Sequence, residues 1–356
     1  MLGNHITVMC SSYPKSKQRE LKDGVEILRL KNSWSFPLQV LKHYMQTERG
    51  NYDAVIEEII GGQRLPFFCT LYVKEPLFAV WYQKNTKVFF EQYSLPIAVV
   101  LSLLENFLAS LYKRRTIISL SQDAKKKLLQ LGLKPENTEV VYAGISTEFN
   151  HVEPNFQKED TIVCLGKMRR YKRIDHALLA FARAFQVSKR KTWKLVIAGK
   201  VSEIDKSYSD ELYELAKKLG IAKQVEFAFN MPEAKKIELL KKAKILLQPS
   251  PVEGFSIVVV EANRCGTPVV ASDGVPMDVA KNGYNGFVYP FGDIEAMADR
   301  IVDLMENEDL WRAISANSRE WSKRFTWSKS VANLNNIIER SCSKQSSESR
   351  PKSLGK

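Results

Sequence analysis

Residues 251–272, PVEGFSIVVVEANRCGTPVVAS, carry the pattern that decides the fold. They begin with a turn of small residues and continue into a predicted helix over residues 255–264, whose apolar run is 257–260. Gly266 stands where a helix C-terminus needs a left-handed residue, and residues 267–271 are typical of a short buried strand. A helix that starts after such a turn has free amide groups at the positive end of its dipole. The stretch therefore predicts an anion-binding loop in an α/β fold.

Two carboxylates bracket this helix start. Glu253 lies in the turn, and Glu261 follows about two helical turns later. Taken singly, each has an ordinary explanation, Glu253 as a solvated loop residue and Glu261 as a helix residue. The whole string, with seven residues between the glutamates and then Cys-Gly-Thr-Pro-Val-Val-Ala-Ser, resembles the signature of family-4 glycosyltransferases. Those enzymes are retaining and nucleotide-sugar-dependent, and have the GT-B fold, in which two Rossmann-like domains face each other across a cleft.

The length and the charge of the chain limit the number of domains and the kinds of partner that it can have. The chain has 356 residues, enough for two domains, and a formal net charge of +13. Residues 1–150 carry +5, residues 151–340 carry +5 and the last sixteen carry +3, so the basic charge is spread out. This distribution suits anionic substrates and the surface of an anionic membrane. No nucleic-acid-binding module is recognisable, and we expect no nucleic-acid partner.

The cysteines and the first residues predict the compartment. Cysteines 10, 69, 164, 265 and 342 are scattered without a Cys-x-x-Cys pair, which is typical of reduced thiols. The first five residues have neither a basic region nor an apolar core, so we expect no secretory signal. The sequence therefore predicts a cytoplasmic protein, either free or peripheral on the cytoplasmic face of a membrane.

Strands alternate with helices in both halves of the chain, which predicts two doubly wound parallel sheets. The predicted strands of the first half are residues 5–9, 25–30, 53–59, 78–82, 117–121 and 139–142, and its helices are 36–47, 93–113 and 123–131. The predicted strands of the second half are 161–165, 193–198, 224–229, 245–248 and 267–271, and its helices are 175–185, 210–219, 232–242, 255–264, 293–305 and 309–323. With the resemblance, this implies an N-terminal acceptor-binding domain at 1–152 and a C-terminal nucleotide-sugar domain at 153–324. A helix at 325–341 crosses back to the first domain, and a disordered basic tail occupies 342–356.

The resemblance continues in the loop Gly166-Lys167-Met168-Arg169-Arg170-Tyr171-Lys172. In the family's donor-phosphate loop a basic residue follows the glycine and a lysine lies five residues further on, which here are Lys167 and Lys172. The family usually has arginine at the first of these positions and glycine after the lysine, where this chain has Arg173; lysine supplies charge without arginine's forked geometry. A solvated basic turn is the plain alternative, but the loop's place between a strand and a helix argues against it. Gly199 matches the family's strand-end glycine.

The family's chemistry assigns roles to these residues. The resemblance implies transfer of a hexose from UDP- or GDP-hexose to an acceptor hydroxyl, with retention at the anomeric carbon. Lys167, Lys172 and main-chain amides of the turn would stabilise the departing diphosphate, Glu261 would bind the ribose, and Glu253 would hold sugar hydroxyls. We expect no metal and no further cofactor, because side chains and a helix dipole supply the positive charge. The predicted catalytic residues are Glu253 and Lys172, and the predicted donor-binding residues are Lys167, Lys172, Gly199, Glu253, Gly254, Phe255, Ser256 and Glu261.

The first half departs from the family in two ways. The family begins with a central strand, a glycine-rich loop and a helix before a segment like residues 4–8, so the N-terminal sheet is expected to be incomplete. Loss of a central strand should leave a gap or force its neighbours to close up. The family also often has a histidine after its third strand, where this chain has Trp81-Tyr82-Gln83. We therefore expect another group to support the sugar, or an altered acceptor chemistry.

Residues 95–111 form the most apolar segment, and Lys113-Arg114-Arg115 follows almost directly. Glu105, Asn106 and Pro96 argue against a membrane-spanning helix. An apolar helix that ends in a basic cluster can dock on a bilayer surface; packing on the sheet with a solvated end is the alternative. The acceptor is accordingly expected to be a glycan or a lipid-linked glycan, used in glycan or glycolipid assembly such as that of lipid-linked oligosaccharides or N-glycan precursors.

Two other functions remain open. One is a catalytically inactive GT-B scaffold that binds a nucleotide sugar or serves as a partner subunit, favoured by the short N-terminus and the missing histidine. The other is a nucleotide-sugar epimerase on the same fold, whose additional acidic and histidine residues are not evident.

Overall fold

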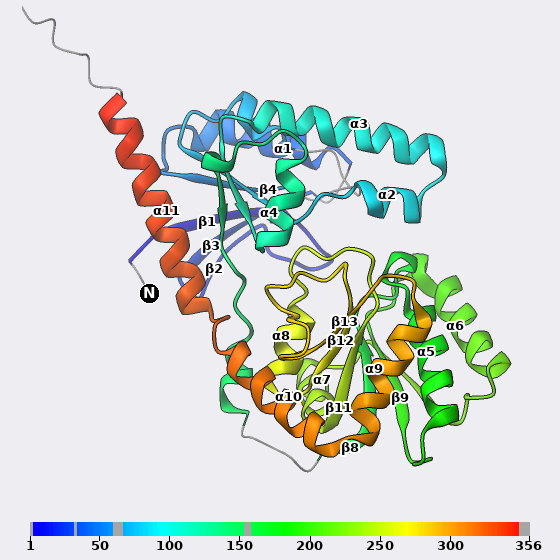
Figure 1. Ribbon diagram of the computed structural model, residues 1–356. Coiled ribbons are helices and arrows are strands. Elements are labelled where there is room, and N and C mark those ends of the chain that lie inside the picture. Colours follow the sequence, from blue (N-terminus) through cyan, green and yellow to red (C-terminus); the bar gives the residue numbers. More distant parts are fainter. Residues whose placement is uncertain (1–2, 32–33, 60–66, 153–157, 349–356) are drawn as a thin grey trace, which may run out of the picture.

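A computed structural model of the chain describes residues 3–31, 34–59, 67–152 and 158–348, and it has two α/β halves joined near residue 150 (Figure 1). The predicted domain boundary after residue 152 adjoins residues that lie outside this description. Residues 349–356 of the predicted tail lie outside it as well.

The C-terminal half is built on one parallel sheet. Its strands are β8 (Glu159–Leu165), β9 (Lys194–Gly199), β10 (Val225–Phe229), β11 (Ala243–Gln248), β12 (Val269–Ser272) and β13 (Gly286–Tyr289), in the order β10-β9-β8-β11-β12-β13. This is the doubly wound order in which the direction of winding reverses between the first and fourth strands, here β8 and β11. Ligands of such sheets bind outside the carboxyl ends of the strands at that switch point.

Helices cover both faces of this sheet (Figure 1). They are α5 (Ile174–Val187), α6 (Lys206–Lys218), α7 (Glu233–Lys242), α8 (Ile257–Arg264), α9 (Ile294–Glu306) and α10 (Glu308–Ser322). One buried core lies between the sheet and α5, α6 and α9, and a second between the sheet and α7 and α8. The buried residues of α5 recur at helical spacing, which explains why this stretch is a helix packed by one face.

The strands of the N-terminal half form two sheets. The first contains β1 (Ile6–Ser11), β2 (Arg19–Lys22) and β3 (Val25–Leu30) in the order β1-β3-β2; the second contains β4 (Val55–Ile59), β5 (Leu77–Trp81), β6 (Thr116–Ser119) and β7 (Thr138–Val140) in chain order. Thus β1 is an edge strand that pairs with β3. The sequence predicts either a gap in the N-terminal sheet or closure of the neighbouring strands. The structure shows the first outcome, because the strands form two separate sheets.

In the described part of this half, four α-helices accompany the sheets: α1 (Phe36–His43), which continues as a π-helical turn (Tyr44–Glu48), α2 (Thr86–Gln92), α3 (Leu95–Tyr112) and α4 (Gln122–Leu129). The predicted helix over 93–113 is thus α3 alone, and α2 precedes it. The short strands β2 and β13 and the helix α2 were not predicted. The short 3₁₀ turns are η2 (Cys69–Leu71), η3 (Pro135–Asn137), η4 (Thr147–His151), η5 (Arg170–Lys172) and η6 (Glu203–Asp205).

The last helix, α11 (Trp327–Glu348), returns to the N-terminal half (Figure 1). Asn333 Nδ2 donates to the carbonyl of Val140 at 3.0 Å, and Ile337 packs with Phe78 and Ile118 in a small core. The helix runs past the predicted end at residue 341, so the prediction of disorder was wrong for residues 342–348.

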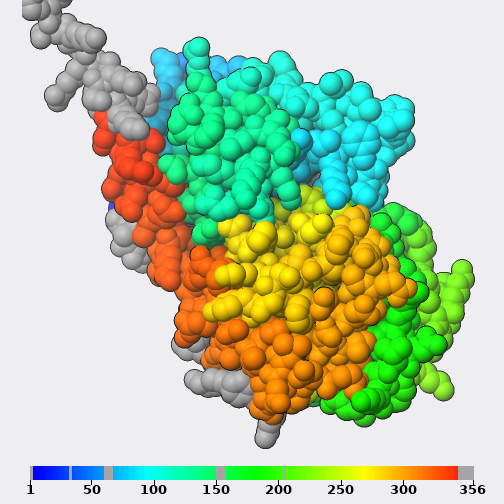
Figure 2. All heavy atoms as spheres, in the orientation of Figure 1, coloured from blue at the N-terminus to red at the C-terminus, as the bar shows by residue number. Residues whose placement is uncertain are grey.

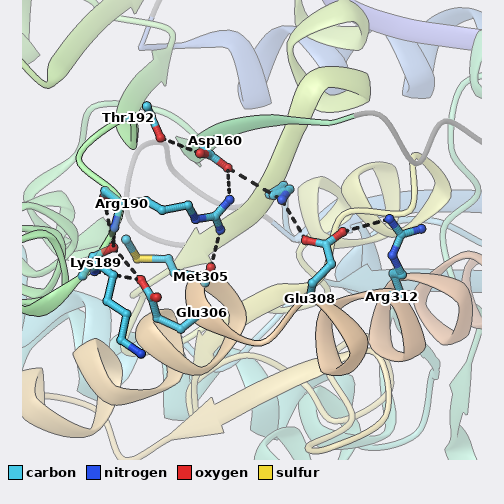
Figure 3. Close-up of polar contacts among 10 residues, drawn as sticks. Asp160, Lys189, Arg190, Thr192, Met305, Glu306, Glu308 and Arg312 are labelled. Carbon is cyan, nitrogen blue, oxygen red and sulfur yellow. Dashed lines mark hydrogen bonds and ion pairs between the residues drawn. The ribbon is translucent and has the colours of Figure 1, made fainter.

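A charged network closes the end of the C-terminal sheet opposite the switch point (Figure 3). Asp160, at the amino end of β8, accepts from Arg190 at 3.1 Å and from Thr192 at 2.6 Å. The buried Lys244 lies 3.0 Å from Glu308 and 3.6 Å from Asp160. Because each acid here has a basic partner and the network lies at the amino ends of the strands, we assign it to stability.

Candidate active site

Two loops meet at the switch point of the C-terminal sheet. One follows β8 and contains Gly166 to Arg173; the other follows β11 and contains residues 249–256, directly before α8. Because β8 and β11 pair in parallel, their carboxyl ends bring the two loops together.

A close backbone approach shapes the first loop. Gly199, at the end of β9, has a φ of +146°, and a Cβ at this position would lie 1.7 Å from the carbonyl oxygen of Gly166. Only glycine permits this contact, so Gly199 acts through the backbone that it supports. Asn230, where the family usually has glycine, also has a positive φ of 54°, which asparagine tolerates.

The two loops are joined by the ion pair of Lys172 and Glu253. Lys172 Nζ lies 2.5 Å from Glu253 Oε1, which also accepts from Gln248 Nε2 at 2.8 Å. The side chains of Lys172 and Glu253 are 17% and 11% exposed. Burial alone would lower the pKa of Lys172, but the Glu253 carboxylate outweighs it and raises that pKa, so the ammonium stays charged.

The N-terminus of α8 has no side-chain cap. Ser256 precedes the helix with a φ of +68°, in the left-handed region, and its side chain makes no capping hydrogen bond. The Ser256 Oγ is buried without a hydrogen-bond partner among the described residues. The helix therefore starts at Ile257, two residues later than predicted, because the backbone of Ser256 is not helical. The first amides of α8 are therefore left without a capping side chain from Ser256, as an anion-binding helix start requires.

Glu261 lies on α8 with one oxygen engaged and the other unpaired. Lys236 of α7 binds its Oε1 at 2.9 Å, whereas its Oε2 is buried and has no partner among the described residues. Burial raises the pKa of Glu261, and the ion pair with Lys236 opposes the rise. Lys236 also pairs with Glu233, and its Nζ lies 5.5 Å from the ring centroid of Phe149. Nothing in the sequence pattern pointed to Lys236.

The remaining predicted residues take different places. Lys167 is exposed at the start of the loop. The Phe255 ring is buried against Tyr142 and Phe325, so only its main chain is available to a ligand. The other basic residues of the loop are paired: Arg169 with Asp205, Arg170 with Glu211 and Arg173 with Asp175.

The N-terminal half closes directly on the second loop. A Cβ on Gly254 would lie 2.3 Å from the carbonyl oxygen of Tyr82, and Ser121 Oγ donates to the carbonyl of Gly254 at 2.7 Å. The same Ser121 Oγ accepts from Ala124 N, which confirms it as the cap of α4. Burial lowers the pKa of Lys127, further along α4, and the charges of Asp123, Asp273 and Glu253 only partly offset this shift.

Tyr82, in the Trp81-Tyr82-Gln83 segment where the resemblance leads one to expect a histidine, is paired with Glu58 of β4. Tyr82 OH donates to Glu58 Oε1 at 2.9 Å; Tyr82 directly follows β5, and Glu58 lies near the carboxyl end of β4. Burial raises the pKa of Tyr82, followed in effect by the charge of Glu58, so the phenol stays protonated. Trp81, the residue before, is instead buried in the core.

Two aspartates, Asp278 and Asp123, form hydrogen bonds between the two halves. Asp278 Oδ2 accepts from the amides of Gln122 and Asp123 at 3.1 and 3.4 Å, so it caps α4 from the other half. In return, Asp123 Oδ2 accepts from Met277 N at 2.8 Å, and Tyr142 OH donates to Asp278 Oδ1 at 2.7 Å. Figure 2 shows the surfaces of these two segments in contact, teal against yellow.

The described residues contain no cluster of three or more His, Cys, Asp or Glu side chains that could hold a metal ion. What they bring together is a buried cation, a helix N-terminus and two carboxylates. This set can hold an anion with a polyhydroxyl group on either side of it.

The chain is similar in sequence to known glycosyltransferases. Residues 146–321 match the sequence model of the family described as "Glycosyl transferases group 1". An uncharacterized glycosyltransferase of Methanocaldococcus jannaschii is 33% identical over 101 residues, covering 28% of this chain and 29% of that protein. D-inositol 3-phosphate glycosyltransferase of Corynebacterium aurimucosum is 23% identical over 235 residues, covering 62% of this chain and 55% of that protein. The chain thus spans at most about half the length of these two curated relatives.

Solved structures resemble most of the chain. Anabaena HepE, in complex with UDP and glucose, superposes with a TM-score of 0.70 at 18% identity, covering 89% of this chain and 86% of that chain. The similarity confirms the predicted GT-B fold.

Proposed function

We propose that this chain is a GT-B glycosyltransferase that moves a hexose from a nucleoside-diphosphate sugar, UDP- or GDP-hexose, to an acceptor hydroxyl with retention at the anomeric carbon. The observation that carries the proposal is the Lys172–Glu253 pair beside the uncapped N-terminus of α8, with the unpaired oxygen of Glu261 on the same helix. The family match over residues 146–321 supports it, because it covers these residues.

Departure of the diphosphate is the step that this site can assist. Negative charge grows on the leaving phosphate, and the Lys172 ammonium is paired with Glu253, which lies in the turn before the uncapped N-terminus of α8. Such preorganised donors stabilise the developing charge without rearranging at the moment of reaction. Lys167, exposed at the mouth of the loop, would add charge as the donor enters. We assign no step to a metal ion.

The two glutamates would bind different parts of the donor, Glu253 the sugar and Glu261 the ribose. Glu253 Oε1 is held by Lys172 and Gln248, which leaves its other oxygen for sugar hydroxyls and for the positive charge at the anomeric centre. Glu261 Oε2 is buried and unpaired in the described structure, and a ribose hydroxyl can donate to it. Lys236 orients Glu261 by holding the opposite oxygen.

On the other side, the acceptor would meet the ends of β4 and β5. Glu58 and Tyr82 stand there as an acceptor–donor pair for hydroxyl groups, next to the turn that contains Gly254. We propose a glycan or lipid-linked glycan acceptor, in glycan or glycolipid assembly such as that of lipid-linked oligosaccharides or N-glycan precursors. We place the reaction in the cytoplasm, at the membrane face, and the cysteines of the described residues, which form no disulfide, suit a reducing compartment.

A donor panel tests the proposal. Thermal unfolding is measured with UDP- and GDP-hexoses in turn, since a ligand at a hundred times its Kd stabilises by about 2.7 kcal/mol. The donor that binds is then assayed for release of nucleoside diphosphate. Binding with hydrolysis or transfer supports the enzyme, whereas binding without turnover supports the alternative of an inactive scaffold, favoured by the divided N-terminal sheet. A chain that binds no nucleotide contradicts both.

A further inference from the structure

We propose that the outer face of α3, together with the basic pair that follows it, docks this protein on the surface of an anionic lipid bilayer. The face, called the α3 stripe below, consists of large apolar side chains at helical spacing. They are Leu95, Val99, Val100, Leu103 and Phe107, which are 67%, 42%, 63%, 64% and 55% exposed. Leu95, Val99, Leu103 and Phe107 recur every fourth residue, so they line one side of the helix.

The opposite side of α3 holds the helix on the protein. Leu108, Ala109 and Tyr112 are buried in the core under the second N-terminal sheet, and Tyr112 OH donates to the buried Glu57 at 2.6 Å. By length and composition α3 could cross a membrane, with a mean hydropathy of 1.7, and 28% of it is buried. Because its inner side belongs to the core, we place α3 flat against the bilayer instead of across it.

The position of α3 leaves the stripe open. The helix runs along the border of the N-terminal half that faces away from the C-terminal half, and the cyan surface at the top of Figure 2 has nothing over it in that view (Figures 1 and 2). A run of exposed large apolar residues of this kind marks an interaction surface.

The charges next to the α3 stripe favour an anionic bilayer as its binding partner. Lys113 and Arg114 are exposed in the turn that follows the helix, while Arg115 donates to Thr70 and belongs to the fold. Glu105, the acidic residue of α3, is buried on the inner side, so the stripe offers no carboxylate to a second copy of this chain. An anionic bilayer supplies both the apolar phase for the stripe and the negative charge for the pair.

The docked helix connects to the candidate active site. Glu105 accepts hydrogen bonds from the amides of Asn85 and Thr86, at 2.7 and 3.1 Å, and so caps α2. Helix α2 in turn packs against η5, which contains Lys172. When α3 is docked, α2 therefore lies between the membrane-bound helix and the loop that contains Lys172. The identity of a lipid-linked acceptor rests on the proposed function, but the docking itself does not.

Sedimentation of the full chain with vesicles tests the proposal. The vesicles are phosphatidylcholine alone and an equal mixture of phosphatidylcholine and phosphatidylglycerol. We expect binding to the mixture that falls as salt is added. Lys113→Gln with Arg114→Gln should weaken it about thirtyfold, because each basic residue near an anionic surface contributes roughly a factor of five. Leu103→Ser with Phe107→Ser should abolish it.

Matched controls keep the outcome clear. Val187→Ser removes an equally exposed apolar residue from the C-terminal half and should leave vesicle binding unchanged. Nucleotide binding, measured without vesicles, checks that each variant is folded and tests the proposed function separately. The proposal is overturned if the wild-type chain does not sediment with the mixed vesicles, or if both double variants sediment like wild type. It is also overturned if the wild-type chain is a dimer that Leu103→Ser with Phe107→Ser dissociates, since a second copy would then cover the stripe.

Discussion

At the scale of single residues, the candidate site is defined by which charges are paired and which are not. Lys172 and Glu253 neutralise each other, whereas Glu261 keeps one buried oxygen without a partner among the described residues. An unpaired buried acceptor is costly unless a ligand completes it. A ligand hydroxyl that donates to Glu261 Oε2 would therefore stabilise the site.

Lys172→Ala should lower kcat by about 100- to 1,000-fold, the usual effect of losing one preorganised donor to a developing negative charge. Release of nucleoside diphosphate from the donor provides the measurement. Arg170→Ala is the matched control, because Arg170 lies in the same loop but is 57% exposed and paired with Glu211. Wild-type turnover in Lys172→Ala would remove this lysine from the reaction.

Glu261→Gln should weaken binding of the bare nucleoside diphosphate by about 1.5–3 kcal/mol, because a ribose hydroxyl loses a charged acceptor. Calorimetry measures the affinity. Glu233→Gln, which changes the other partner of Lys236, should bind like wild type. Equal affinities for wild type and Glu261→Gln would show that the ribose lies elsewhere.

Lys158 predicts a pH dependence of stability. Burial lowers its pKa to about 7 from an ordinary value of 10.5, and its Nζ donates to Thr267 Oγ1 and to the carbonyl of Leu240. Between these two pKa values the unfolded chain binds a proton that the folded chain does not, so stability should rise as the pH increases from about 7 toward 10. Urea unfolding at a series of pH values should show this rise, and Lys158→Met should flatten it. The exposed Lys189→Met serves as control, and a flattening there of equal size would contradict the assignment.

At the scale of elements, helix ends depend on residues from other elements. Helix α4 is capped by its own Ser121 and by Asp278 of the other half, and α2 is capped by Glu105 of α3. Asn85, which precedes α2, makes no capping bond of its own. The orphan amides of these helices are thus satisfied through tertiary contacts.

Glu105→Ala should lower stability by about 1–3 kcal/mol, because the buried amides of Asn85 and Thr86 lose their acceptor. Hydrogen exchange of the amides of residues 85–92 should accelerate, and the thermal midpoint should fall. Asn106→Ala is the control on the same helix, since Asn106 is exposed and its side chain bonds to Ser102 O. Unchanged exchange in Glu105→Ala would mean that α2 holds its own N-terminus.

At the scale of the whole molecule, the two halves contact each other at the site itself. The turn that contains Gly254 lies against Tyr82 and Ser121, so the position of one half sets the shape of the donor loop in the other. Helix α11 ties the halves together at a second place, away from the site (Figure 1).

Asp278→Ala should loosen this contact, because α4 loses a cap worth about 0.5–2 kcal/mol and Tyr142 loses its acceptor. Small-angle scattering without ligand should give a larger radius of gyration, and saturating nucleotide sugar should reverse part of the increase. Asp299→Ala, an exposed change on α9, should scatter like wild type. Identical scattering from Asp278→Ala and wild type would show that Asp278 does not hold the halves together.

Much of the C-terminal half was predictable from sequence, since its strands and helices have clear local patterns, apart from the short strand β13, which was missed. The loops around Lys172 and Glu253 were predictable as well, because they follow consecutive signals along the chain. The N-terminal half was harder to predict: the short β2 and α2 carry weak patterns, and the end of α11 was placed too early.

By itself, the sequence determined the α/β class, the doubly wound order of elements and the residues that border the switch point, because periodicity and turn chemistry act over a few neighbouring residues. Only the tertiary structure decided which partner each charge takes, as with Lys236 and Glu261 or Asp278 and the start of α4. It also decided that one side of α3 is core and the other is exposed. These outcomes depend on contacts between residues far apart in the chain, whose approach is set by packing of the whole fold and not by any local pattern.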